Sequence, residues 1–193
     1  MKLLKINVVI AVFFGLLMNM GCRTPETTYH FAEGVDLSFI KKVAVLPLDN
    51  LTNDKFASDA VRQLVVSELL LTNIVDVALP GDTVAALDKA GVRSVSAISA
   101  EKIKEVGNSL KVQAVILGSV EKYGEMRSGS FTAPEVAITL MMADTASGSI
   151  LWSVTKTAVG DSFMARHFGA RSDTLSELTL KVVRDCIRTL GQY

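Results

Sequence analysis

The N-terminal segment limits how much of this chain can belong to a folded domain. Residues 8–18 form an unbroken apolar run, which is preceded by Lys2 and Lys5 and followed by Gly21. A helix that crosses a bilayer needs about 20 apolar residues, so this run is too short to be a typical span. A basic start, a short apolar core and a small residue at the junction are typical of a secretory signal. We therefore predict that residues 1–21 are removed and that the domain is built from the rest of the chain.

Cys22 stands directly after this segment, where the chain becomes polar. A small residue followed by cysteine resembles the lipobox of bacterial lipoproteins, although Asn19 and Met20 replace the leucine and the alanine or serine that lipoboxes favour. The resemblance implies that the Cys22 thiol carries a diacylglycerol and that its amine, exposed by cleavage, is acylated too. Several acyl chains, at about 0.8 kcal/mol per methylene, hold a protein on a membrane. The alternatives are an ordinary cleaved signal and an uncleaved anchor.

The composition of the remaining 172 residues fits one domain of ordinary size. Residues 1–21 carry two lysines and no acids, so the rest carries 18 basic and 20 acidic side chains and a net charge of −2. This balance gives no indication of a nucleic-acid partner. With Cys22 acylated, Cys186 is the only thiol left, which excludes an internal disulfide.

Residues 22–38 are polar, contain one proline and lack a sustained period, so we expect a tether between lipid and domain. The 16 residues after Cys22 span at most about 55 Å. The alternative is an edge strand around residues 27–31 that packs on the body. Arg23 follows the cysteine, where lipoproteins held in the inner membrane of enteric bacteria carry aspartate. The absence of that aspartate favours an outer-membrane lipoprotein that faces the periplasm.

Residues 39–193 predict a single α/β domain. The apolar run 43–46 is typical of a strand buried on both faces. The expected elements continue with a helix capped by Asn53 or Asp54, a strand at 74–79, helices at 82–91 and 101–110, strands at 112–125, 136–145 and 149–158, and a final helix at 175–190. Loops are expected at 126–135 and 160–172, and a tight turn at 144–148. The order β-α-β-α-α-β-β-β-α predicts a mixed sheet with helices packed against it.

The final helix has the clearest pattern in the chain. Its apolar stripe consists of Leu175, Leu178, Val182, Val183, Cys186, Ile187 and Leu190. Cys186 lies inside this stripe, so we expect a small core residue and not a reactive thiol.

The sequence contains few candidate catalytic groups. His30 and His167 are the only histidines and lie far apart in sequence, and no metal-binding motif includes them. Asp161, Ser162 and His167 are close together, but no G-x-S-x-G elbow presents the serine to a substrate. We therefore expect no enzyme, no cofactor and no small-molecule substrate. A hydrolase that uses Ser162 and His167 is the disfavoured alternative.

The loop near residue 165 is the best candidate for contact with another protein. It combines Phe163 and Phe168 with Arg166 and Arg171. Aromatic and arginine side chains concentrate binding energy at protein interfaces. The alternative is that the two phenylalanines cover the end of the sheet. The loop 124–134 is a weaker second candidate.

Three segments resemble a known group of envelope proteins: residues 43–50 (VAVLPLDN), 114–120 (AVILGSV) and 144–152 (DTASGSILW). They are similar to motifs of CsgG-type lipoproteins and of LpoB-type activators of penicillin-binding proteins. The resemblance implies a fold like the N-terminal domain of TolB. It also implies contact with envelope proteins or with copies of itself during envelope assembly, secretion or cell-wall synthesis.

One alternative within the same group is a ring-forming subunit of an outer-membrane secretion apparatus. Pore-forming members carry long extra hairpins, for which the loops expected here leave no room. A self-sufficient channel is therefore not expected.

Overall fold

The computed structural model describes residues 27–128, 131–160, 171 and 173–191. One mixed seven-stranded sheet forms its centre, in the order β1-β7-β6-β5-β2-β4, and β3 pairs with β5. The strands are β1 (Thr28–Phe31), β2 (Lys42–Val45), β3 (Asp49–Asn50), β4 (Asp76–Val77), β5 (Ala114–Ser128), β6 (Phe131–Asp144) and β7 (Ile150–Val159), and the helices are α2 (Ala57–Thr72), α3 (Pro80–Lys89), α4 (Ala100–Leu110) and α6 (Leu175–Leu190). The predicted fold class and element order are confirmed, and the structure adds β1 and β3.

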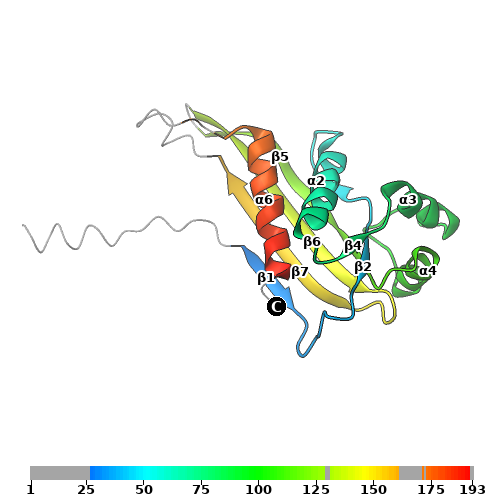
Figure 1. Cartoon of the computed structure of the whole chain (residues 1–193). Helices are drawn as coiled ribbons and strands as arrows, with labels where there is room; N and C mark the ends of the chain where they lie inside the picture. The colour runs from blue at the N-terminus through cyan, green and yellow to red at the C-terminus, as the bar shows by residue number, and fades with distance from the viewer. Residues whose placement is uncertain (1–26, 129–130, 161–170, 172, 192–193) are drawn as a thin grey trace, which may run out of the picture.

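Helices cover both sides of the parallel part of the sheet. β2 pairs in parallel with β4 and β5, and it is buried on both faces as predicted. Val43 and Val45 belong to the core that includes α2 and α6, whereas Ala44 and Leu46 belong to a second core that includes α3 and α4. In Figure 1, α6 and α2 lie side by side across the sheet, and α3 and α4 stand together beyond β2.

The antiparallel part is a meander of β5, β6 and β7. The predicted turn at residues 144–148 is confirmed. The Asp144 carboxylate accepts hydrogen bonds from the backbone N–H groups of Ala146 and Ser147 and from the Ser147 hydroxyl. Gly148 takes the positive φ of 81° that closes the turn.

The loop expected at residues 126–135 is wrong. β5 and β6 stay paired as far as Ser128 and Phe131, so a long hairpin occupies this region. Lys122 and Glu135, 2.6 Å apart across the two strands, support the pairing. Pro134 has no N–H to donate, but its carbonyl accepts a hydrogen bond of 2.7 Å from Gly160. Because the pairing at this position uses only the carbonyl, a proline is compatible with it.

The α6 stripe faces the core as predicted. Its buried residues include Leu178, Val182, Val183, Cys186, Ile187 and Leu190. Burial raises the pKa of the Cys186 thiol to about 12, because the anion has no solvent to stabilise it. This confirms Cys186 as a core residue.

The helix starts were predicted less well. Ser99 caps α4 and accepts a hydrogen bond from the Lys102 N–H. The cap of α2 is Phe56, which corrects the expected cap at Asn53 or Asp54. The Asp54 carboxylate instead accepts from the Phe56 N–H at 2.9 Å, so it stabilises the turn before the helix.

The expected tether also needs a correction. β1 pairs antiparallel with β7 as the outermost strand of the sheet, with Thr28 opposite Thr155 and Phe31 opposite Trp152. The edge strand, considered as the alternative, is therefore the one that forms. The chain belongs to the domain from β1 onward, which shortens the segment available to act as a tether.

No helix within the described ranges is long and apolar enough to cross a membrane.

Candidate contact surfaces

Most residues of the predicted sites lie outside the part of the chain that the structure describes. These are the predicted attachment residue Cys22, the predicted contact residues Phe163, Arg166 and Phe168, and Ser162 and His167 of the hydrolase alternative. Their roles stay predictions. Arg171 is the one predicted contact residue with a described position.

Arg171 lies at the start of α6, where its exposed side chain donates to Glu177 Oε1 at 2.7 Å. Glu177 also forms a capping box with Thr174: its carboxylate accepts from the Thr174 N–H and hydroxyl, and the Thr174 hydroxyl accepts from the Glu177 N–H. The hydrogen bonds from Thr174, with smaller contributions from Arg171 and Lys181, lower the pKa of Glu177. Through its ion pair with Glu177, Arg171 therefore stabilises the start of the last helix.

A group of exposed apolar side chains, not expected from the sequence, lies at one edge of the sheet. β2 and β4 are parallel, so the segments that come after them leave at the same edge. This carboxyl-edge patch consists of Leu51, Phe56, Leu79 and Val84, of which the first three are 66%, 66% and 68% exposed. The Lys55 ammonium lies 5.0 Å from the Phe56 ring centroid.

Arg62 holds α2 at this same edge. Its guanidinium donates from Nε and Nη2 to the Val45 carbonyl, at 3.1 and 2.8 Å, and lies 3.5 Å from the Pro80 carbonyl. Burial lowers the pKa of Arg62 from its ordinary value. These hydrogen bonds therefore attach the first turns of α2 and α3 to the end of β2. The backbone that carries the carboxyl-edge patch is held in place by them.

A second exposed apolar group lies at the opposite edge, before β2 and β4. This amino-edge patch consists of Phe39, Leu70, Leu71 and Ile74. It adjoins a groove of about 430 Å³ lined mainly by Leu37, Ile40, Leu69, Ile74, Val75, Met142 and Leu190. Leu71 is 74% exposed, although it sits in the LLL run of α2. The helical period that buries Leu69 turns the next two leucines outward, so the sequence carried a signal for this patch.

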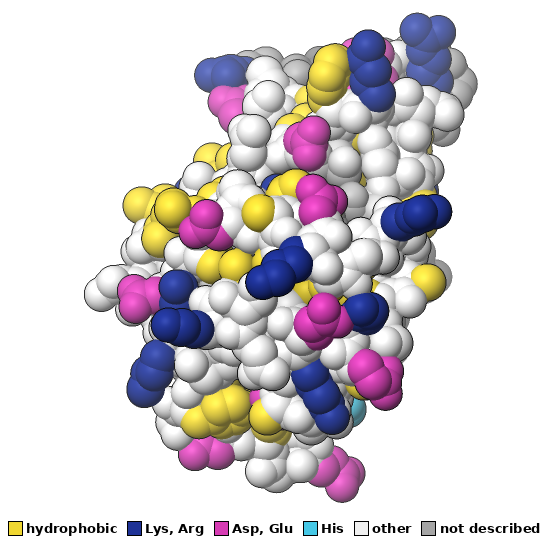
Figure 2. Space-filling view, turned by 90° about the vertical axis from the view of Figure 1, so that its right-hand side faces the viewer, with side chains coloured by type: hydrophobic (Ala, Val, Ile, Leu, Met, Phe, Trp, Pro, Cys, Tyr) yellow, Lys and Arg dark blue, Asp and Glu magenta, His cyan; other side chains and the backbone are white. Residues whose placement is uncertain are grey.

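Figure 2 shows the side of the molecule on which α3 and α4 lie. Apolar side chains gather there in separate patches, with lysine, arginine, aspartate and glutamate between them.

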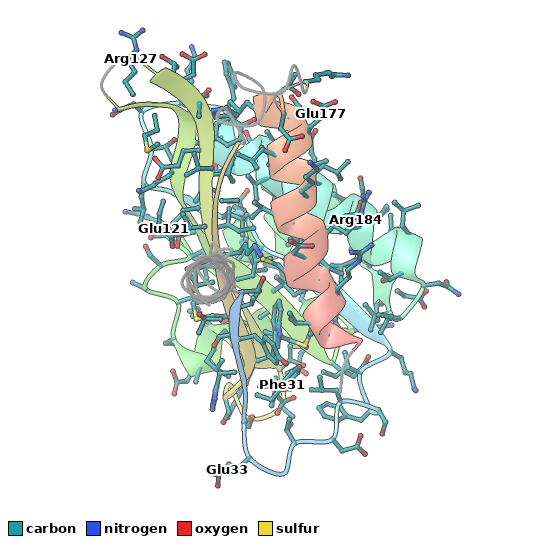
Figure 3. All side chains as sticks on the ribbon, turned by 90° about the vertical axis from the view of Figure 1, so that its left-hand side faces the viewer. Phe31, Glu33, Glu121, Arg127, Glu177 and Arg184 are labelled. Atoms are coloured by element: carbon teal, nitrogen blue, oxygen red, sulfur yellow. The ribbon has the colours of Figure 1, made fainter. Side chains whose placement is uncertain are left out.

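Beyond the second core, the face of β5, β6, β7 and β1 that points away from α6 carries a polar row. Ser119, Thr139, Thr155 and Thr28 are aligned across the four strands, and the Thr139 and Thr155 hydroxyls lie 2.9 Å apart. Glu121 accepts from the Ser119 hydroxyl at 2.7 Å, and Figure 3 places it on the side of the sheet opposite α6. An antiparallel sheet with one polar face needs no cover on that face.

The described residues contain no group of three or more His, Cys, Asp or Glu side chains able to hold a metal ion. Within the same ranges, every buried side-chain nitrogen or oxygen has a hydrogen-bond partner. No buried polar atom there marks a missing ligand.

The fold is shared with solved structures of bacterial proteins. PelC from Paraburkholderia phytofirmans, whose structure is a dodecamer, matches with a TM-score of 0.58 and 22% identity, over 84% of this chain and 96% of that one. Lipoprotein GNA1162 from Neisseria meningitidis matches with a TM-score of 0.56 and 15% identity, over 79% and 99%. The LpoB C-terminal domain from Salmonella enterica reaches a TM-score of 0.47 at 18% identity, over 66% and 87%, which is too low to support an argument.

No family model matches this chain, and no curated protein matches it either. At these identities the likeness concerns the fold alone. This chain has the mixed α/β fold found in PelC and in lipoprotein GNA1162.

Proposed function

We propose that this chain is a lipid-anchored protein of the bacterial envelope that acts by binding other proteins, first among them copies of itself. Cys22 is the attachment site in this proposal, residues 1–21 are its signal, and the outer membrane is its location. The process served is envelope assembly, secretion or cell-wall synthesis. No catalytic step is part of the proposal.

The observation that carries it is the pair of exposed apolar patches at opposite edges of the domain. Neither core cluster includes these side chains, which are 42% to 74% exposed. Phe56 precedes α2, and Leu71 lies at its far end, about 22 Å along a helix of this length. Two unlike patches at opposite edges favour head-to-tail contact between copies, which closes into a ring when the rotation allows.

The PelC structure, which has the same fold, is a dodecamer, and this supports the assembly of several copies. A ring-forming subunit of an outer-membrane secretion apparatus is accordingly the second candidate function. It differs from the first in requiring a closed ring of defined size.

Native mass spectrometry of the full chain, extracted from membranes in mild detergent, tests self-assembly. We expect an oligomer, and we expect Leu71→Ser and Phe56→Ser each to reduce its fraction without changing the melting temperature. Lys89→Ser, an exposed polar change at the end of α3, is the control and should leave the oligomer intact. A monomer at every concentration would contradict self-assembly, and a single closed stoichiometry would favour the ring.

A further inference from the structure

The first described residue is held firmly against the domain. Thr27 Oγ1 accepts a hydrogen bond of 2.7 Å from Nζ of Lys156 in β7. The same ammonium lies 3.4 Å from Asp185 Oδ2 on α6. Thr28 then begins β1, opposite Thr155. The chain is therefore fixed from Thr27 onward at the place where β1, β7 and α6 meet.

The segment between this fixed point and Cys22 is short. Five Cα–Cα steps separate Cys22 from Thr27, which span about 18 Å at full extension. A globular domain of this size is about 40 Å across. A lipid on Cys22 therefore cannot reach a membrane that lies beyond the far side of the domain.

We propose that the side of the domain formed by β1 and its neighbours β7 and α6 rests on the lipid surface, with Tyr29 in the headgroup layer. This inference rests on the proposed anchoring at Cys22. Figure 3 looks onto this side, with Phe31 in its lower part, Glu33 below it and Arg184 on α6.

The side chains on this side suit a membrane surface. Tyr29 is 46% exposed and meets the edge of Phe31, with ring centroids 5.9 Å apart. Tyrosine has an apolar ring and a polar hydroxyl, and it is enriched where lipid meets water. The Lys156 ammonium and the Asp185 carboxylate form an ion pair. Neither charge is therefore left unpaired when this side of the domain rests on the membrane. His30 and Glu33 are exposed at the margin, where headgroup water solvates them.

The opposite side of the domain then points away from the bilayer. β4 is the last strand on the other edge of the sheet, five strand spacings from β1, or about 24 Å. Lys89 at the end of α3 is exposed on that far side. The two apolar patches lie at the ends of the parallel strands, so both stay free for lateral contacts.

Fluorescence quenching by nitroxide lipids tests this orientation. Thr28→Cys and Lys89→Cys variants of the full lipidated chain are labelled with a thiol-reactive fluorophore and placed in phosphatidylethanolamine–phosphatidylglycerol vesicles that contain doxyl lipids. His30→Cys is a second probe on β1, should Thr28→Cys fold poorly. Cys186 is buried with its pKa raised, and an acylated Cys22 has no thiol, so only the introduced cysteine reacts.

We expect several-fold stronger quenching at residue 28 than at residue 89. Inserting 20 Gly/Ser residues after Pro25 should reduce the quenching at residue 28 to the level seen at residue 89. Equal quenching without the insertion would overturn the orientation while leaving the anchor intact, provided that intact mass shows an acylated Cys22. An unmodified Cys22 would overturn the anchor and the orientation together.

Discussion

The indole nitrogen of Trp152 donates a hydrogen bond of 3.0 Å to the hydroxyl of Thr189, and both groups are buried. The bond joins β7 to the last turn of α6 across the main core. The same hydroxyl donates to the Cys186 carbonyl at 2.7 Å, so its one oxygen satisfies two buried groups.

Thr189→Val removes this oxygen at nearly constant volume. The indole N–H and the Cys186 carbonyl then lose a buried partner, which costs about 1–3 kcal/mol. We expect the free energy of unfolding, measured in urea, to fall by that amount. Thr189→Ser keeps the hydroxyl and should lose less. A Thr189→Val variant as stable as the original chain would show that this bond contributes little.

Gly107 of α4 lies so close to Thr145 that a Cβ at residue 107 would overlap the threonine side chain. Thr145 cannot easily move away, because its hydroxyl bonds the Val112 and Gln113 carbonyls. We expect Gly107→Ala to cost about 1–3 kcal/mol. Gly81→Ala in α3, where a Cβ meets nothing within 4 Å, is the matched control and should gain about 0.5–1 kcal/mol. The melting temperatures of both variants test this prediction. Changes of the same sign in the two melting temperatures would contradict the close packing of Gly107 against Thr145.

Acid should weaken the domain partly through Glu177. Hydrogen bonds from Thr174 lower its pKa below the ordinary value of 4.5 in the folded state. The stabilisation is therefore complete above about pH 4.5 and is lost as the pH falls through the folded pKa. Glu177→Gln keeps an acceptor in the capping box but loses the titration. We expect this variant to lose less stability than the original chain between neutral pH and about pH 3. If the free energy of unfolding in urea fell equally with pH in both proteins, this role of Glu177 would be contradicted.

Phe168→Ala tests the predicted contact loop. We expect weaker capture of partners from membranes by the tagged, lipidated variant, with an unchanged melting temperature. Lys89→Ala, on the far side of the sheet from β1, is the control. A large drop in melting temperature would instead support a covering role for the phenylalanine and remove it from the contact surface.

The parts of the fold that could be predicted are those where one short segment carries its own pattern. The run 43–46 indicated a strand buried on both faces, and the α6 stripe indicated its buried side, because period and burial coincide there. The turn at residues 144–148 was predictable because Asp144 and Gly148 supply its hydrogen bonds and its backbone conformation locally.

The parts that were missed depend on distant partners. The strand at residues 28–31 was expected only as the alternative to a tether, because its formation depends on pairing with β7, more than 120 residues later in the chain. The long hairpin was missed because a loop was expected at residues 126–135, whereas β5 and β6 stay paired through this segment and Pro134 contributes only its carbonyl. The apolar patches were overlooked because the exposure of a side chain depends on which faces of the helices the sheet does not cover.

The most direct test of the account is the intact mass of the protein purified from membranes. We predict a chain that begins at Cys22, without residues 1–21, and that is heavier than its sequence by a diacylglycerol and an acyl chain. A chain that retains residues 1–21 and carries a free Cys22 thiol would contradict the account.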